Sequence, residues 1–166
     1  MAFNDAATPA TAEPGHLAGK EDLAGTGEPA SLSLASAVMF VSDLDRAVAF
    51  YAELLAWTVA VHDLDAALLT CPDGFQLYLR GRGPRAAFHG LGHIGVQYLI
   101  WTAPSESELD RCEQVLRQQS SQVTRSTLDG FTVLEGRGPD NAPILIAHPG
   151  PREAPRHQVM RRIYRW

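Results

Sequence analysis

The sequence repeats one order of expected elements twice. Each copy has a strand, then an amphipathic helix with apolar residues at helical spacing, then three short strands set apart by turn residues. The elements are expected at residues 34–41, 42–57, 58–63, 66–71 and 75–81 in the first copy, and at 93–101, 104–119, 122–127, 130–136 and 142–148 in the second. The repeat is 57 residues, measured from Ser36 to His93.

Both helices begin with a capping signal. Ser42 and Asp45 have the spacing of a capping box at the first helix, and Ser105 and Glu108 have it at the second.

The length and composition fit one globular domain. The chain has 166 residues, of which 45% are apolar and 20% charged. We expect residues 34–150 to form a single two-module domain, with modules at 34–84 and 91–150. Residues 1–33 have few large apolar side chains to bury and are expected to be a flexible leader. Residues 151–166 are expected to be a tail with a short helix.

Several classes of protein are excluded. The apolar runs are much shorter than the ~20 residues of a membrane helix, and the N-terminus lacks a signal-peptide pattern. Cys71 and Cys112 form no paired motif and are expected to be buried free thiols. The net charge is −5, and the arginine-rich tail is too short to indicate nucleic-acid binding. A cytoplasmic protein without membrane or nucleic-acid partners is expected.

The repeated module predicts an α+β fold with a ligand cleft. In each βαβββ module the helix covers one face of the sheet and leaves the other face open. Two such modules side by side give a curved half-barrel sheet with a central cleft. Concave, mostly apolar cavities of this kind are where small ligands bind.

Three stretches resemble a known family. FVSDLDRAVAFYAELLAW resembles the opening strand and helix of the vicinal oxygen chelate superfamily, which includes glyoxalase I, extradiol dioxygenases and bleomycin resistance proteins. GHIGVQYLIW resembles the first strand of the second module, and GPDNAPILIAHP resembles the closing turn and strand. The resemblance covers about residues 35–149 and implies the same two-module fold.

The resemblance also implies where a metal would be bound. Its four ligand positions fall on Ser36, Tyr78, His93 and Leu145, so only the histidine retains a usual ligand type. A divalent catalytic centre needs about three nitrogen or oxygen ligands, and leucine cannot coordinate at all. We therefore expect no metal and no other cofactor.

The role of His93 stays open at this point. A histidine at a strand end is a satisfied structural group in one interpretation. In the register of the family it lies on the concave face, where it would be a hydrogen-bonding or acid/base group in the pocket. No nucleophile motif accompanies it, and no catalytic residue is assigned.

The sequence therefore predicts a protein of the bleomycin-resistance type that binds a partly aromatic small molecule without a metal. The alternative is a lyase, isomerase or dioxygenase that uses a degenerate metal site or His93 as acid/base. Arg80, Arg82 and Arg85 are candidates for a cleft rim that favours an anionic ligand. The resemblance implies a homodimer. The expected ligand-binding residues are Ser36, Val38, Phe40, Gln76, Tyr78, His93, Gln97 and Leu145.

Overall fold

The predicted repeat is present as two βαβββ modules in the computed structural model, which describes residues 33–87, 90, 94, 96–128 and 130–153. The first module contains β1 (Ser36–Val41), α1 (Leu44–Leu55), β2 (Thr58–His62), β3 (Ala66–Thr70) and β4 (Gln76–Gly81). The second contains β5 (Ile100–Thr102), α2 (Glu106–Gln119), β6 (Thr124–Leu128), β7 (Phe131–Arg137), the 3₁₀ turn η1 (Pro139–Asn141) and β8 (Pro143–His148).

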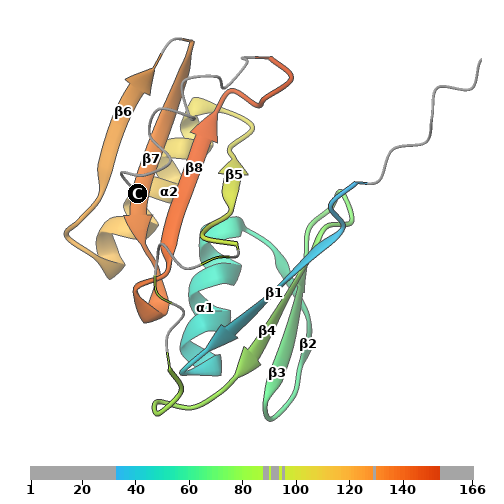
Figure 1. Cartoon of the computed structure of the whole chain (residues 1–166). Helices are drawn as coiled ribbons and strands as arrows, with labels where there is room; N and C mark the ends of the chain where they lie inside the picture. The colour runs from blue at the N-terminus through green and yellow to red at the C-terminus, as the bar shows by residue number, and fades with distance from the viewer. Residues whose placement is uncertain (1–32, 88–89, 91–93, 95, 129, 154–166) are drawn as a thin grey trace, which may run out of the picture. The chain divides into compact units, whose positions relative to one another are not determined.

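Each module has its own mixed four-stranded sheet. The first sheet has the strand order β1-β4-β3-β2 and the second has β5-β8-β7-β6. In both, the opening strand pairs in parallel with the closing strand, and the remaining pairs are antiparallel. α1 packs on one face of the first sheet and α2 on one face of the second (Figure 1). The expected α+β class with two βαβββ modules is confirmed, as two sheets that are not closed on each other.

The faces covered by the helices form one hydrophobic core. Apolar residues of α1 at helical spacing, such as Leu44 and Leu54, pack over Leu77 and Leu79 of the first sheet. The same cluster continues into the second module through Leu116 and its neighbours. Each fully buried leucine contributes about 1.5–3 kcal/mol, so this shared core holds the two modules together.

One of the two capping predictions is correct. Ser105 is the N-cap of α2, and its side chain accepts a hydrogen bond from the backbone N–H of Glu108. At α1 the N-cap is Asp43 rather than Ser42, and its carboxylate accepts from the N–H of Arg46 at 3.0 Å. The expected Ser42 cap is wrong because a residue far along the chain occupies its hydrogen-bonding groups.

That residue is Asp140, in the turn before β8. The backbone N–H of Ser42 donates to Asp140 Oδ2 at 2.9 Å, and the Ser42 hydroxyl donates to Oδ1. Beside this turn, Phe50 of α1 packs so closely on Gly138 that a Cβ there would lie 2.8 Å from its ring. Burial, and next the Asp140 charge, raise the pKa of the nearby Tyr51 hydroxyl. The second module thus holds the N-terminal end of α1.

The C-terminal end of α1 is held by α2. Arg111 Nη1 donates to the backbone carbonyl of Glu53 and its Nη2 to that of Leu54, both at 2.7 Å. The last carbonyls of a helix lack partners within the helix and attract positive charge. Glu108 in turn binds the Arg111 guanidinium at 2.6 Å and orients it. One arginine therefore caps the end of a helix in the other module.

Three aromatic rings meet next to this junction. The ring centroids of Trp57 and Trp101 are 5.7 Å apart, and Phe75 lies 5.8 Å from Trp57 and 6.3 Å from Trp101. All three pairs are edge-to-face, the arrangement that such rings prefer. Trp57 and Phe75 come from the first module and Trp101 from the second.

The second module begins with a much shorter strand than predicted. Residues 93–101 are expected as a strand, but β5 spans only Ile100–Thr102, and the described residues 96–99 are not in a strand. Ile100 pairs with Leu145 on β8, so in the same register residues 99 and 98 would lie opposite Ile144 and Pro143. Proline has no N–H to donate, so it can support only part of such a ladder.

Some predictions for the termini and cysteines lie partly outside the described residues. The leader 1–33 and the tail 151–166 are described only at Ser33 and at 151–153. Both cysteines are free; Cys112 is buried, but Cys71 is only half-buried. Neither of the two described helices has the length and apolar character needed to cross a membrane.

The end of α1 gives a first prediction. Ala56 is the C-cap in the left-handed conformation, with φ of 53° and ψ of 39°. Because glycine adopts this conformation without steric cost, Ala56→Gly should raise the free energy of unfolding by about 1 kcal/mol, and Tm by about 2–4 °C. Ala52→Gly, inside the helix, should lower stability by about the same amount. Thermal unfolding of the two variants checks this; a loss of stability in Ala56→Gly would contradict it.

The Ser42 contact gives a second prediction. Asp140 and Asn141 both have φ of 57°, so glycine relieves backbone strain at either position. Asp140→Gly should nevertheless lower the free energy of unfolding by about 1.5–3 kcal/mol, since it removes two hydrogen bonds to a carboxylate. Asn141→Gly is the matched control and should change stability by less than about 0.5 kcal/mol. Equal effects in urea unfolding would show that the Asp140 side chain contributes nothing.

Candidate functional site

Five of the predicted binding residues share one face of the first sheet. Ser36, Val38 and Phe40 alternate along β1 with residues that pack toward α1, and Gln76 and Tyr78 do the same along β4. The register places Ser36 opposite Gln76 and Val38 opposite Tyr78. The strand alternation predicted from the sequence therefore brings all five to the face turned away from α1.

This face combines exposed apolar groups with polar ones. Val38 and Phe40 are each 66% exposed and Tyr78 is 40% exposed. The Tyr78 hydroxyl donates to Gln76 Oε1 at 2.9 Å. The guanidinium of Arg82 lies 5.1 Å from the centre of the Phe40 ring. Such a surface can stack a flat ring and offer a few hydrogen bonds.

The predicted arginine rim is only partly available. Arg80 is paired with Asp65 at 2.7 Å, and Arg82 is stacked on Phe40. Arg85 is exposed in the segment after β4. The first two therefore already have partners within the first module.

The remaining predicted residues lie in or before the second module. Leu145 is on β8, only 1% exposed, on the face of the second sheet turned away from α2. Gln97 is half-buried and precedes β5. His93 lies outside the described residues. Across the residues that the structure describes, no three histidine, cysteine or acidic side chains gather to hold a metal ion.

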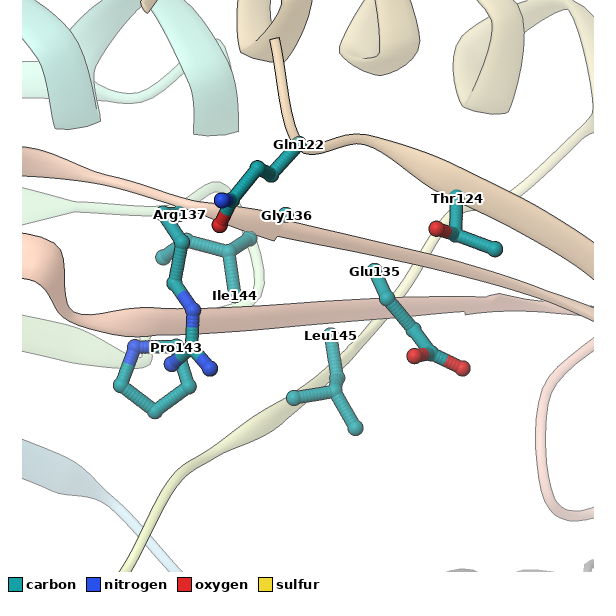
Figure 2. A pocket seen from close by; sticks show the side chains of 8 residues that line it. All are labelled: Gln122, Thr124, Glu135, Gly136, Arg137, Pro143, Ile144 and Leu145. Carbon is teal, nitrogen blue, oxygen red and sulfur yellow. The ribbon is translucent and has the colours of Figure 1, made fainter. Parts of the chain in front are cut away.

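Leu145 lines a pocket on the second sheet. The pocket has a volume of about 150 Å³ and is drawn in Figure 2. Most of its lining comes from side chains of β6, β7 and β8 on the face away from α2. The lining residues are Gln122, Thr124, Glu135, Gly136, Arg137, Pro143, Ile144 and Leu145.

Two charged residues of β7 take part in this lining. Figure 2 shows the Arg137 guanidinium beside Pro143 and the Glu135 carboxyl group beside Leu145. Glu135 and Arg137 alternate with Leu134, which is fully buried against α2. Arg137 Nη1 is shielded from solvent and has no hydrogen-bond partner among the residues that the structure describes.

Neither Glu135 nor Arg137 was predicted from the sequence as a site residue. The available signal was the alternation in FTVLEGR, which places two charges on one face of a strand whose other face is apolar. The positions implied by the resemblance drew attention to β8 instead.

Comparison with known proteins connects this geometry to a set of solved structures. No family model and no curated protein matches the sequence. Among solved structures, the glyoxylase/bleomycin resistance protein/dioxygenase domain from Frankia sp. EAN1pec is 25% identical; the match covers 72% of this chain and 92% of that one, with a TM-score of 0.58.

Two further structures agree in fold. A glyoxalase/bleomycin resistance protein from Albidiferax ferrireducens T118 is 19% identical, covering 69% of this chain and 98% of its own, with a TM-score of 0.57. Lactoylglutathione lyase from Agrobacterium tumefaciens is 17% identical, covering 72% and 95%, with a TM-score of 0.53. The chain has the two-module fold of the glyoxalase, bleomycin resistance and dioxygenase structures, and the predicted resemblance to the vicinal oxygen chelate superfamily is confirmed at the level of that fold.

Proposed function

We propose that the chain is a small-molecule-binding protein of the glyoxalase/bleomycin-resistance type. It binds a partly aromatic ligand against the sheet faces that the helices leave uncovered. The observation that carries this proposal is the exposure of Val38, Phe40 and Tyr78 together on one sheet face. A contiguous exposed apolar patch marks a binding surface more often than scattered apolar side chains do.

The ligand is proposed to bind without a metal. At the positions implied by the resemblance, Ser36 is a poor ligand, neutral Tyr78 is little better and Leu145 cannot coordinate. The usual carboxylates are replaced, so the negative charge that favours a dication is reduced at these positions. His93 and Gln97 are proposed to donate or accept hydrogen bonds to the organic ligand. The protein is proposed to act in the cytoplasm, where free thiols persist.

Removal of the Phe40 ring tests the binding face. The first step is a thermal-shift screen against aromatic metabolites and antibiotics, in which a ligand at 100 times its Kd adds about 2.7 kcal/mol of stability. Phe40→Ala should then weaken binding of the hits about 10- to 100-fold, because stacking area worth about 1.5–3 kcal/mol is lost. Phe40 is largely exposed, so the fold should be retained.

The matched control is Leu64→Ala. Leu64 is 101% exposed in the turn between β2 and β3, and its replacement should leave affinity unchanged. A screen without hits, or hits that are indifferent to Phe40→Ala, would refute the proposal. Elemental analysis of protein purified without chelator adds a further check. A stoichiometric transition metal that is lost on His93→Ala would favour the lyase, isomerase or dioxygenase alternative instead.

The chain is also proposed to form a homodimer. β1 and β5 are the outermost strands of their sheets among the described residues. Edge strands present unpaired backbone groups, and an exposed apolar face beside such an edge favours association. Light scattering on the eluting protein should give twice the 18.0 kDa chain mass. Replacing Val38 with Asp should shift the protein toward the monomer, and a wild-type monomer at 100 μM would contradict the proposal.

A further inference from the structure

Arg137 differs from the other arginines around the second sheet. Arg111, Arg117 and Arg125 each bind at least one carboxylate at 2.6 Å or less. Arg137 makes no ion pair within the described part of the chain, although its Nη1 is shielded from solvent. A charged donor that has lost its water and gained no acceptor destabilises the ligand-free protein.

This arginine lies at the rim of a pocket that is partly open to solvent. Its guanidinium borders the pocket of about 150 Å³ at the Pro143 end, and the Glu135 carboxyl group borders it at the Leu145 end (Figure 2). Gln122 and Thr124 add neutral polar groups to the lining. The cavity is below the roughly 300–1,000 Å³ of a site that encloses a whole drug-sized molecule. It has room for one end of a ligand, such as an anionic group and the atoms bonded to it.

We infer that Arg137 recognises a carboxylate carried by the ligand, in the pocket formed by β6, β7 and β8. The inference rests on the proposed small-molecule binding and assigns the chemical class of the ligand. The planar guanidinium fork matches a carboxylate, whose two oxygens accept two parallel hydrogen bonds. The arginines predicted from the sequence for an anionic ligand were Arg80, Arg82 and Arg85, and the first two have partners of their own.

The charges of the lining favour a carboxylate over a phosphate. Arg137 is the single cation among the lining residues and Glu135 the single acid. Their charges cancel, so the lining offers no net positive charge for a dianion. A phosphate or phosphonate carries twice the charge of a carboxylate and loses more hydration free energy in a partly desolvated site. The predicted ligand is therefore an aromatic or otherwise apolar monocarboxylate.

The test uses benzoate, benzamide and phenylphosphonate as matched probes on the full chain. Benzoate should bind more tightly than the other two in isothermal titration. Arg137→Gln should raise the Kd of benzoate about 10- to 100-fold, the range for loss of a hydrogen bond to a charged group. The same variant should change the Kd of benzamide less than about threefold. Arg137→Lys should recover only part of the loss, because lysine lacks the fork. The control Arg117→Gln, which removes an exposed pair on α2, should leave all three probes unchanged.

Thermal unfolding of the ligand-free protein gives a second readout. Because Arg137 Nη1 has no partner in the described part of the chain, the Arg137→Met variant should have a Tm at or above that of the wild type. A Tm lowered by several degrees would show that Arg137 stabilises the sheet, which would overturn the inference.

The outcomes separate this inference from the proposed function. If Phe40→Ala weakens the binding of neutral aromatic compounds but Arg137→Gln leaves the Kd of benzoate unchanged, the carboxylate assignment fails and the proposed function stands. If phenylphosphonate binds more tightly than benzoate, the assigned class is wrong. If no probe and no screened compound binds, both proposals fail.

Discussion

The second module holds α1 at both ends, and the rest of the structure depends on this. Before the helix, the Asp140 carboxylate accepts hydrogen bonds from the backbone N–H and the hydroxyl of Ser42. At its end, the Arg111 guanidinium donates to the backbone carbonyls of Glu53 and Leu54. These contacts fix the helix along its axis, while the shared apolar core fixes it against the sheets. Hydrophobic burial alone has no preferred direction, so polar contacts at the two ends supply the register between the modules.

With both helices committed to this junction, the opposite sheet faces are left for other roles. They differ from each other. The first sheet presents exposed Phe40 and Tyr78, whereas the equivalent face of the second contains buried Val133 and Leu145. The polar groups differ as well. Gln76 and Tyr78 are hydrogen-bonded to each other, whereas Arg137 lines a pocket and its Nη1 has no acceptor among the described residues. One face is suited to stacking and the other to holding a charged group.

The sequence was sufficient to predict the elements that depend on their own periodicity. Both helices and seven of the eight strands follow from the apolar spacing, within a few residues at their ends. β5 is shorter than predicted, because the described residues 96–99 do not join the ladder with β8. The Ser42 cap was predicted wrongly and the Arg137 pocket was not predicted, for a related reason. Each depends on a partner or a neighbouring strand far along the chain, and local patterns contain no information on which distant groups meet.

The aromatic cluster at the junction makes the association of the modules visible to spectroscopy. Trp57 of one module and Trp101 of the other pack edge to face, with their ring centroids 5.7 Å apart. Indole emission depends on local polarity, and both rings are half-buried. A movement that parts the modules would separate the two rings and expose both indoles further to water. The chain therefore carries an intrinsic fluorophore pair at the place where its two halves would separate.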